Sequence, residues 1–457
     1  MSVSQATFEQ FRGAIQTLGD SLQPETLSDG ERVARAKRVF LERLDVGMAF
    51  ELESCVHCGM CAEACHFYVQ TEEARYTPTL KYDLLRWVYR REVGPQRWLY
   101  RLISRDIRVQ DLRDWEELVF DSCTECGRCA LMCPMGINIP KLVHVTREAL
   151  GAAGIVPKEL QALAEEQSTH ESIFGVGREQ LIGAIEKLRE QGLVIPLDQP
   201  SADVVVLTTV VDIMLFTDAL AATARIMNHL GVNWTMVTSG FEAANFGLLS
   251  GHEDLQRRAT KRIIDAAIAC GARTVIVPEC GHAYPALRWE GANELGRPLP
   301  FEVLAISEFI GRELKSGRLK VRPVGPGRKV AYHDPCKVAR HGGALEEPRE
   351  ALKALAVDLR ETASNREMNW CCGGGAGVFV INRATGLRQK AFEKKKEQVD
   401  ATGADTVVTA CGSCRLNLMA GAAHVNWDKK IESLVEMVGA NLASRGNDHR
   451  NGVRSHE

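Results

Sequence analysis

The sequence predicts a multidomain chain of mixed class (α+β/α/β), in which a helical, cysteine-rich part precedes two α/β modules. Short apolar runs at 204–207, 274–277 and 406–409 indicate buried strands, and helical stretches at 252–269 and 385–401 lie between them. Strands that alternate with helices favour parallel α/β layers. Before residue 200 the apolar periodicity is instead helical.

Composition and charge set outer limits on function. The 457 residues suffice for about two to four domains, and a formal net charge of -3 gives no sign of a general nucleic-acid binder. The apolar run 204–216 is broken by Asp212, so we expect no membrane span. The segment 1–13 lacks the charged-then-apolar pattern of an export signal, and we therefore expect a cytoplasmic protein.

The chain contains fifteen cysteines. Structural disulfides do not persist in a reducing compartment, so these thiols are interpreted as metal ligands. Eight fall in two C-x-x-C-x-x-C-x-x-x-C runs, five form a later set, and Cys270 and Cys280 remain.

The two runs have the spacing of ligands for 4Fe-4S clusters, because three thiols of a run wrap one cube while the fourth reaches the other cluster. We therefore predict one cluster on Cys55, Cys58, Cys61 and Cys133, and a second on Cys123, Cys126, Cys129 and Cys65. Zinc is the competing occupant, although structural zinc normally uses two separated pairs of ligands. His66 stands where proline is usual, and His57 is expected to face solvent or support a ligand rather than bind metal.

The later set is organised around 370–375, where Trp370 precedes two adjacent cysteines and three glycines. Its members are Cys336, Cys371, Cys372, Cys411 and Cys414. Four thiolates complete an ordinary cubane, so five predict a cluster of unusual form or a fifth, reactive thiol. The alternatives are a buried apolar cysteine pair and a phosphate-binding loop, and the latter is weak because 373–377 lacks the full dinucleotide fingerprint.

Two further segments have open interpretations. The arm 1–54 places Val33, Ala36, Phe40 and Leu44 on one helical face, which suits a packing brace or, alternatively, a membrane-surface helix. The insert between the runs is rich in arginine and aromatic residues. This composition suits an amphipathic helical pair, or a docking face for a redox partner or an anionic substrate protein. Nucleic acid is the least favoured partner. The insert contains Arg75, Arg86, Arg90, Arg91, Arg97, Arg101, Arg105, Arg108 and Arg113, with Tyr82, Trp87, Tyr89, Trp98 and Tyr100.

The two α/β modules resemble one unit used twice, because 259–280 and 390–412 share the order helix, glycine turn, strand and cysteine-glycine. The first copy keeps only Cys280, which is expected either to line the gap between the copies or to be packed in a core, whereas Cys270 is expected in a core. The predicted domains are 1–54 (helical arm), 55–195 (two-cluster helical domain with the insert), 200–322 (degenerate module), 325–440 (intact module) and 441–457 (disordered tail).

On these motifs, residues of about 50–440 resemble the CCG-domain iron-sulfur proteins related to the D subunit of heterodisulfide reductase. One degenerate and one intact copy look most like the DsrK-type subunit of the dissimilatory sulfite reductase-associated membrane complex. The resemblance implies a helical ferredoxin-like domain with two 4Fe-4S clusters followed by two α/β CCG-type repeats, the second holding a non-cubane iron-sulfur cluster.

The resemblance also implies a catalytic subunit that passes single electrons through two cubanes to a non-cubane cluster, where a disulfide or trisulfide is cleaved or formed. His333, His282 and Tyr284 are then expected to donate protons, although His333 can equally cap a turn. Cys280 is expected to be a thiolate that captures a substrate sulfur. The implied partners are a membrane cytochrome b-type, quinone-interacting subunit and a small disulfide- or trisulfide-carrying protein. They would place the chain at the inner face of the cell membrane.

Two competing functions share this layout. One is an iron-sulfur relay subunit of a flavin-dependent glycolate, lactate or glycerol-phosphate dehydrogenase, and the other is a non-catalytic scaffold. A cavity beside the five-thiol set discriminates between them, because a relay needs none.

Overall fold

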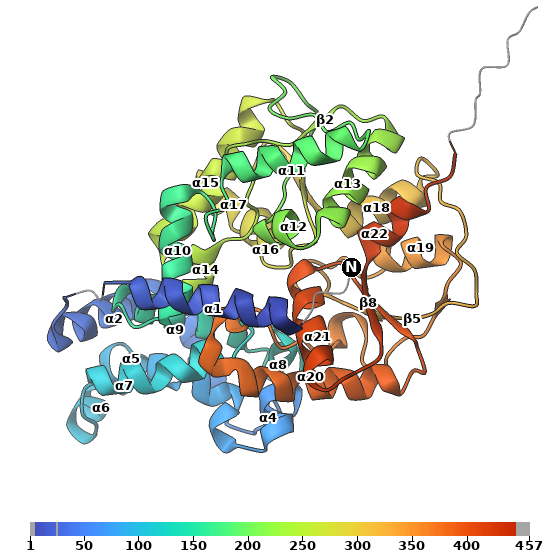
Figure 1. Ribbon diagram of the computed structural model, residues 1–457. Helices are drawn as coiled ribbons and strands as arrows, with labels where there is room; N and C mark the ends of the chain where they lie inside the picture. The colour runs from blue at the N-terminus through green and yellow to red at the C-terminus, as the bar shows by residue number, and fades with distance from the viewer. Residues whose placement is uncertain (1–4, 24–25, 445–457) are drawn as a thin grey trace, which may run out of the picture.

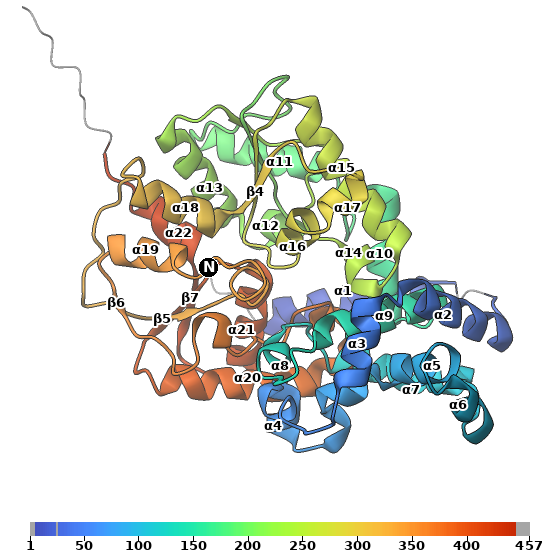
Figure 2. The same cartoon turned by 180° about the vertical axis from the view of Figure 1, so that it is seen from behind.

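The computed structural model describes residues 5–23 and 26–444, so most of the disordered tail expected at 441–457 lies outside the described residues. Figure 1 shows the helical N-terminal part (blue to cyan) below the first α/β module (green to yellow), with the second module (orange to red) beside both. Figure 2 shows the same arrangement from behind. The predicted fold class is confirmed, since a helical part precedes two four-stranded parallel sheets.

The regular structure of the described residues up to 195 is helical. The α-helices are α1 (Gln5–Ser21), α2 (Asp29–Arg43), α3 (Val46–Ser54), α4 (His66–Thr71), α5 (Asp83–Glu92), α6 (Arg97–Ile103), α7 (Val109–Glu116), α8 (Arg128–Leu131), α9 (Ile139–Ala152), α10 (Lys158–His170) and α11 (Arg178–Glu190). Among the described residues, none of the helices combines the length and apolar character that crossing a membrane requires.

Helix α2 shows how the local sequence fixes an element. The Ser28 hydroxyl accepts the N–H of Glu31, and the Glu31 carboxylate accepts the N–H of Ser28 at 2.8 Å, which is a capping box. Ala36 and Phe40, from the predicted apolar face, are fully buried, and α2 packs against α9. The face that a membrane surface would need is therefore used inside the protein, which favours the brace interpretation.

The first module contains β1 (Val204–Val206), α12 (Val210–Met214), α13 (Thr217–Leu230), β2 (Trp234–Thr235), α14 (Phe246–Ser250), α15 (Glu253–Ala269), β3 (Thr274–Val277), α16 (Ala283–Arg288), α17 (Gly291–Leu295), β4 (Glu302–Ala305) and α18 (Ile306–Lys315). Its strands are parallel in the order β2-β1-β3-β4. The sequence located β1 and β3, but it missed the two edge strands, which are short or begin with an exposed charged residue.

The second module contains β5 (Lys329–His333), α19 (Glu347–Ala354), β6 (Asp358–Leu359), α20 (Thr385–Asp400), β7 (Thr406–Thr409), α21 (Gly412–His424), β8 (Lys430–Ser433) and α22 (Leu434–Ala440). Its strands are parallel in the order β6-β5-β7-β8, which is the order of the first module. The shared topology agrees with the repeat inferred from the sequence.

The modules pack on each other reciprocally. Helix α18 packs against α19, and α22 packs against α13. The helix after the last strand of each module therefore meets a helix that lies between the first two strands of the other module. Glycines allow these close approaches, because a Cβ at Gly311 would lie 2.4 Å from the Cβ of Glu347 and one at Gly439 would lie 2.6 Å from that of Ala222. The Gly412 N–H donates to the Glu279 carbonyl at 2.5 Å, so the loops after β3 and β7 meet between the sheets.

Arg147 on α9 joins all three parts of the structure. Its fully buried guanidinium donates to the carbonyls of Val119 and Cys123 in the helical part, Leu249 in the first module and Ala376 in the second. The distances from nitrogen to oxygen are 2.9, 2.7, 3.2 and 2.7 Å, respectively. Four carbonyls with a single cationic donor make this residue the main polar link between the parts.

Candidate metal centre

The first predicted thiol set lies near the surface. Cys55, Cys58 and Cys133 are the neighbouring thiols that act on Cys61, and burial followed by their charge raises the pKa of Cys61 to about 11. Cys58 is exposed, Cys61 is buried, and the other two are half-buried. The structure therefore brings together one thiol from the second run and three from the first, in the predicted combination.

Arg86 from the insert closes over this first set. It is buried, donates to the Tyr82 hydroxyl at 3.0 Å and to the Asp83 carboxylate at 2.9 Å, and contacts the His57 ring. Burial opposes ionisation of Cys55, but hydrogen bonds and charge from Tyr82 and Arg86 outweigh it and lower the pKa of that thiol. Sequence reasoning did not connect Arg86 with the first run.

The second predicted set encloses a cavity of about 380 Å³, which Cys65, Cys123, Cys126 and Cys129 line. Lys81 lies beside it, with its ammonium nitrogen 3.7 Å from the Cys65 sulfur, and donates to the Ser122 carbonyl. Burial opposes the charge of Lys81, but the surrounding thiolates outweigh it and raise the lysine pKa. Four thiols around one small cavity, next to a fixed cation, form a donor set that suits an iron-sulfur cube.

The two runs also share a backbone conformation. His57 and Gly59 flank Cys58 with φ of 53° and 80°, and Glu125 and Gly127 flank Cys126 with φ of 47° and 83°. Positive φ is rare outside glycine, so its recurrence at two non-glycine positions indicates loops bent around a common kind of ligand. At Gly127 a Cβ would lie 2.7 Å from the His341 ring, so only glycine fits.

The five later thiols come together at the carboxyl ends of the second sheet. Cys336 follows β5, Cys371 and Cys372 lie in the segment after β6, and Cys411 and Cys414 lie at the start of α21 after β7. All five are buried. Hydrogen bonds link Cys371 to Cys336 and Cys372, Cys372 to Cys414, and Cys414 to Cys411, so the thiols form one continuous group.

Backbone geometry explains how adjacent cysteines serve one site. Gly373 has φ of +95°, and its N–H donates to the Cys371 sulfur at 3.4 Å, so the chain turns directly after the pair. Asn417 on α21 donates to the Cys372 carbonyl at 2.6 Å. At the start of α21 the Cys414 N–H donates to the Cys411 sulfur at 3.4 Å.

His333 and Asp334 precede Cys336 and have different roles. Arg349 holds Asp334 by a bidentate ion pair at 2.8 and 3.0 Å, which fixes the loop. His333, Cys372 and Cys414 have ligand atoms within 4.8 Å of one another. The His333 ring interacts with Cys372, and this contact helps to lower the pKa of the Cys372 thiol. A buried imidazole next to two thiols is a donor set that suits a metal group.

The second thiol set and the five-thiol set are in direct contact. The Cys371 thiol hydrogen-bonds to Cys126, which raises the pKa of Cys371 and lowers that of Cys126. Arg340 donates to the Cys126 carbonyl at 2.6 Å. Arg128 lies 3.7 Å above the centre of the Trp370 ring. The second set is therefore adjacent to the five-thiol set without an intervening layer of protein.

Cys280 lies in the gap between the modules. It is 4% exposed, and a Cβ on the next residue, Gly281, would lie 3.4 Å from the Cys411 sulfur. Cys280 lines the cavity between the modules and also packs in the first module core, so both of its predicted locations apply, and Cys270 is buried in the same core. Burial, followed by the nearby Cys411, raises the pKa of Cys280, so the expected lone thiolate does not fit this environment.

A cavity of about 740 Å³, partly open to solvent, adjoins Cys280. Its walls combine the first module, the second module and α1, and Gly374, Gly412 and Ser413 form the wall towards the five thiols. Glu242 and Glu279 also line it, and burial raises their pKa values to about 7 and about 8. Sequence reasoning missed both acids, although Glu279 directly precedes Cys280.

The expected proton donors are placed less favourably. Burial lowers the pKa of His282 to about 4, and its ring nitrogen accepts the Ala376 N–H at 2.6 Å. Burial likewise lowers the pKa of His333. The Tyr284 hydroxyl donates to Glu308 at 2.7 Å and lies in the first module core, away from the cavity. Neutral histidines can donate hydrogen bonds here, but they hold no spare proton at neutral pH.

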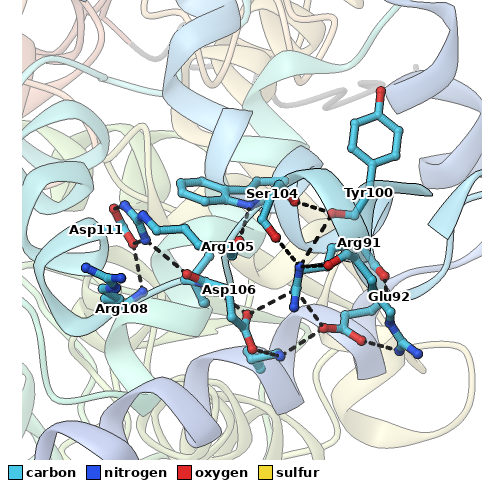
Figure 3. A network of polar contacts seen from close by, with 12 residues as sticks. Arg91, Glu92, Tyr100, Ser104, Arg105, Asp106, Arg108 and Asp111 are labelled. Carbon is cyan, nitrogen blue, oxygen red and sulfur yellow. Dashed lines mark hydrogen bonds and ion pairs between the residues drawn. The ribbon is translucent and has the colours of Figure 1, made fainter. Parts of the chain in front are cut away.

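The arginines of the insert are largely engaged inside the helical part. Figure 3 shows Arg91 between the Ser104 carbonyl, at 2.5 Å, and the carboxylates of Glu92 and Asp106, each at 3.8 Å. Arg105 pairs bidentately with Asp111 at 2.6 Å. These contacts favour the helical-pair interpretation of the insert over a basic docking face.

Comparisons with known proteins agree with this geometry. Residues 51–137 match the 4Fe-4S dicluster domain, and residues 330–419 match the cysteine-rich CCG domain. The D subunit of the dihydromethanophenazine:CoB–CoM heterodisulfide reductase of Methanosarcina mazei is 28% identical over 407 residues, which is 85% of this chain and 93% of that protein. The Hdr-like menaquinol oxidoreductase iron-sulfur subunit of Archaeoglobus profundus is 25% identical over 456 residues (88% and 81%). The EtfAB:quinone oxidoreductase of Syntrophomonas wolfei is 24% identical over 422 residues (85% and 58%).

Proposed function

Because this chain is a CCG-domain iron-sulfur protein related to the D subunit of heterodisulfide reductase, we propose that it is the catalytic electron-transfer subunit of a DsrK-type complex. In this role it reduces, or forms, a disulfide or trisulfide. The observation that carries the proposal is the sequence of thiol sets from the exposed Cys58 to the buried five, ending beside a cavity.

The assignment of ligands follows the three sets. Cys55, Cys58, Cys61 and Cys133 hold one 4Fe-4S cluster, Cys65, Cys123, Cys126 and Cys129 hold the second, and Cys336, Cys371, Cys372, Cys411 and Cys414 hold a non-cubane cluster. When bound, the clusters supply single electrons and iron, whereas cleavage of an S–S bond takes two electrons. The burial of all five later thiols excludes water from that site.

The residues around the cavity define what the chain itself contributes. Cys280, His282 and Glu279 line the side of the cavity that belongs to the first module, and His333 lies against the thiols on the other side. Cys280 and both histidines position the sulfur compound by hydrogen bonding. Glu242 and Glu279 hold protons near neutral pH, which suits delivery to a leaving thiolate.

We assign electron entry to the first set, because Cys58 is its exposed ligand. Exposed apolar side chains flank its loops or lie on α3, which leads into Cys55. They are Val46, Phe50, Val56, Met60, Leu131 and Met135, and we call them the entry surface. Exposed apolar patches mark protein contacts. The occupant is a partner subunit with its own redox cofactor, in line with the quinone oxidoreductases among the relatives. A cytochrome b-type subunit would hold the chain at the inner face of the membrane.

Changing Val56 and Met60 to aspartate is expected to slow reduction of the chain by its co-purified partner at least about tenfold, because two charges must be desolvated at the contact. Reduction by dithionite should be unchanged. Val194→Asp, at an exposed position between α11 and β1, is the matched control. Equal rates for the double variant and this control would show that electrons enter elsewhere.

The competing function is a relay for a flavin-dependent dehydrogenase. The cavity beside Cys280 and Gly412 favours the reductase, since a relay does not require a space for substrate next to its last cluster. The two functions differ in the product, which is a thiol in one case and a reduced external carrier in the other.

The test is steady-state disulfide reduction by the Cys411→Ser variant with a viologen dye as reductant. The variant is expected to lose thiol production while the two cubanes still reduce, because their ligands lie in another part of the fold. Cys270→Ser is the control, since Cys270 is buried in the first module and its thiol donates to the Ala267 carbonyl, outside the three thiol sets. Full activity of Cys411→Ser would reject the five-thiol site as the reacting centre.

A further inference from the structure

The cavity beside Cys280 occupies the place in the first module that the five thiols occupy in the second. Its lining includes Val210 after β1, Glu242 after β2, and Glu279 and Cys280 after β3. The five thiols likewise follow β5, β6 and β7. Ligands of parallel sheets bind at the carboxyl ends of the strands, and this cavity lies at that position in the first module.

The lining of this cavity is mostly apolar. Phe11 lies against Phe174 and Phe379, with ring centres 5.0 and 6.1 Å apart, and these rings form one wall. Val210, Leu249 and Leu416 are among the other apolar lining residues. A mostly apolar lining with a few polar groups is typical of small-molecule sites.

The charged groups of the lining have one sign. Among the described residues that line the cavity there is neither lysine nor arginine, and the ionisable carboxyls are Glu242 and Glu279. Glu242 accepts the N–H groups of Val210 and Ala244, each at 2.8 Å, and Glu279 accepts the Val435 N–H at 3.2 Å. An anionic ligand would lose its water here without gaining a cation, and such desolvation is costly.

We propose that this cavity binds an uncharged, apolar organic disulfide or trisulfide, with its sulfur atoms towards Cys280 and Gly412. The inference rests on the proposed function and adds the substrate class. A cavity that binds an anionic disulfide would instead need cationic side chains in its lining. The apolar arms of the ligand lie against the aromatic wall, where burial of apolar surface stabilises them.

The test compares two disulfides with equal carbon chains, neutral dipropyl disulfide and dianionic dithiodipropionate. Binding is measured by equilibrium dialysis with the oxidised, cluster-loaded protein, so that no turnover is needed. The neutral compound is expected to bind at least about tenfold more tightly, because each carboxylate would remain unpaired. Equal or tighter binding of the dianion, or no binding of either compound, overturns the inference.

Phe174→Arg is expected to reverse the preference, because Phe174 is half-buried and the variant places a cation in the lining. Phe174→Met is the matched control, since it removes the ring without adding charge, and it should keep the neutral preference. If Phe174→Arg does not fold, the wild-type comparison alone decides the matter. Binding of dipropyl disulfide without reduction would reject the proposed function, whereas reduction without charge preference would reject only this inference.

Discussion

The double variant Cys371→Ala, Cys372→Ala is expected to retain the iron of two cubanes, about eight atoms per chain, and to lose the rest. Cys371 contacts Cys336 and Cys372, and Cys372 in turn contacts Cys414. The two adjacent cysteines therefore lie in the middle of the five-thiol set, and the three thiols that remain are too few to hold a cluster. Disulfide turnover should fall by about a thousandfold or more, as for removal of groups that act as a unit.

Iron and sulfide analysis of the anaerobically reconstituted protein, with electron paramagnetic resonance, checks this prediction. Cys270→Ala is the control for loss of a buried thiol outside the sets, and it should keep the full iron content. The spectra of the two cubanes should be unchanged in the double variant. Iron content equal to that of the wild type would show that the adjacent cysteines are packing residues.

The second large effect is expected on stability. Arg147→Met leaves four buried carbonyls without their cationic donor. It also removes one of the cations beside the Glu125 carboxylate, which lies 3.7 Å from Arg147 and keeps Lys337 at 3.8 Å. Removing one partner of a buried ionic group costs about 3–5 kcal/mol in the free energy of unfolding. Arg147→Lys should recover only part of this, because an ammonium cannot reach carbonyls in three parts of the fold.

Denaturant unfolding of the cluster-loaded protein, followed by circular dichroism under anaerobic conditions, measures the loss. Arg273→Met is the matched control, because Arg273 is 84% exposed and its ion pair with Asp203 is at the surface; its effect should be within about 0.5 kcal/mol. Similar unfolding curves for Arg147→Met and Arg273→Met would contradict the linking role of Arg147.

The sequence predicted the grouping of the thiols better than it predicted their surroundings. Cysteine spacing grouped the thiols into three sets because cluster geometry restricts the distances between ligands, and the strand runs predicted β3 and β7 because central parallel strands are continuously apolar. The edge strands β6 and β8 were missed because they are short or partly exposed, so their apolar pattern is weak.

Residues that act across long sequence distances could not be predicted. Lys81 belongs to the insert, yet it lies among the thiols of the second set, and Arg147 looks like an ordinary helical arginine until its four carbonyl partners are known. Cys280 illustrates a further limit. The repeat left its position open between the gap and a core, and its protonation depends on burial, which no local pattern specifies.

The central claim is that electrons pass through the two cubanes to a disulfide bound beside the five-thiol set. A single-turnover experiment tests it most directly: the fully reduced, cluster-loaded protein is mixed with dipropyl disulfide and freeze-quenched, and cluster oxidation and free thiols are counted. We expect the clusters to reoxidise with two thiols formed for every two electrons lost. Clusters that stay reduced with the disulfide, yet reoxidise with a flavin or quinone without forming thiol, would contradict the claim and identify a relay.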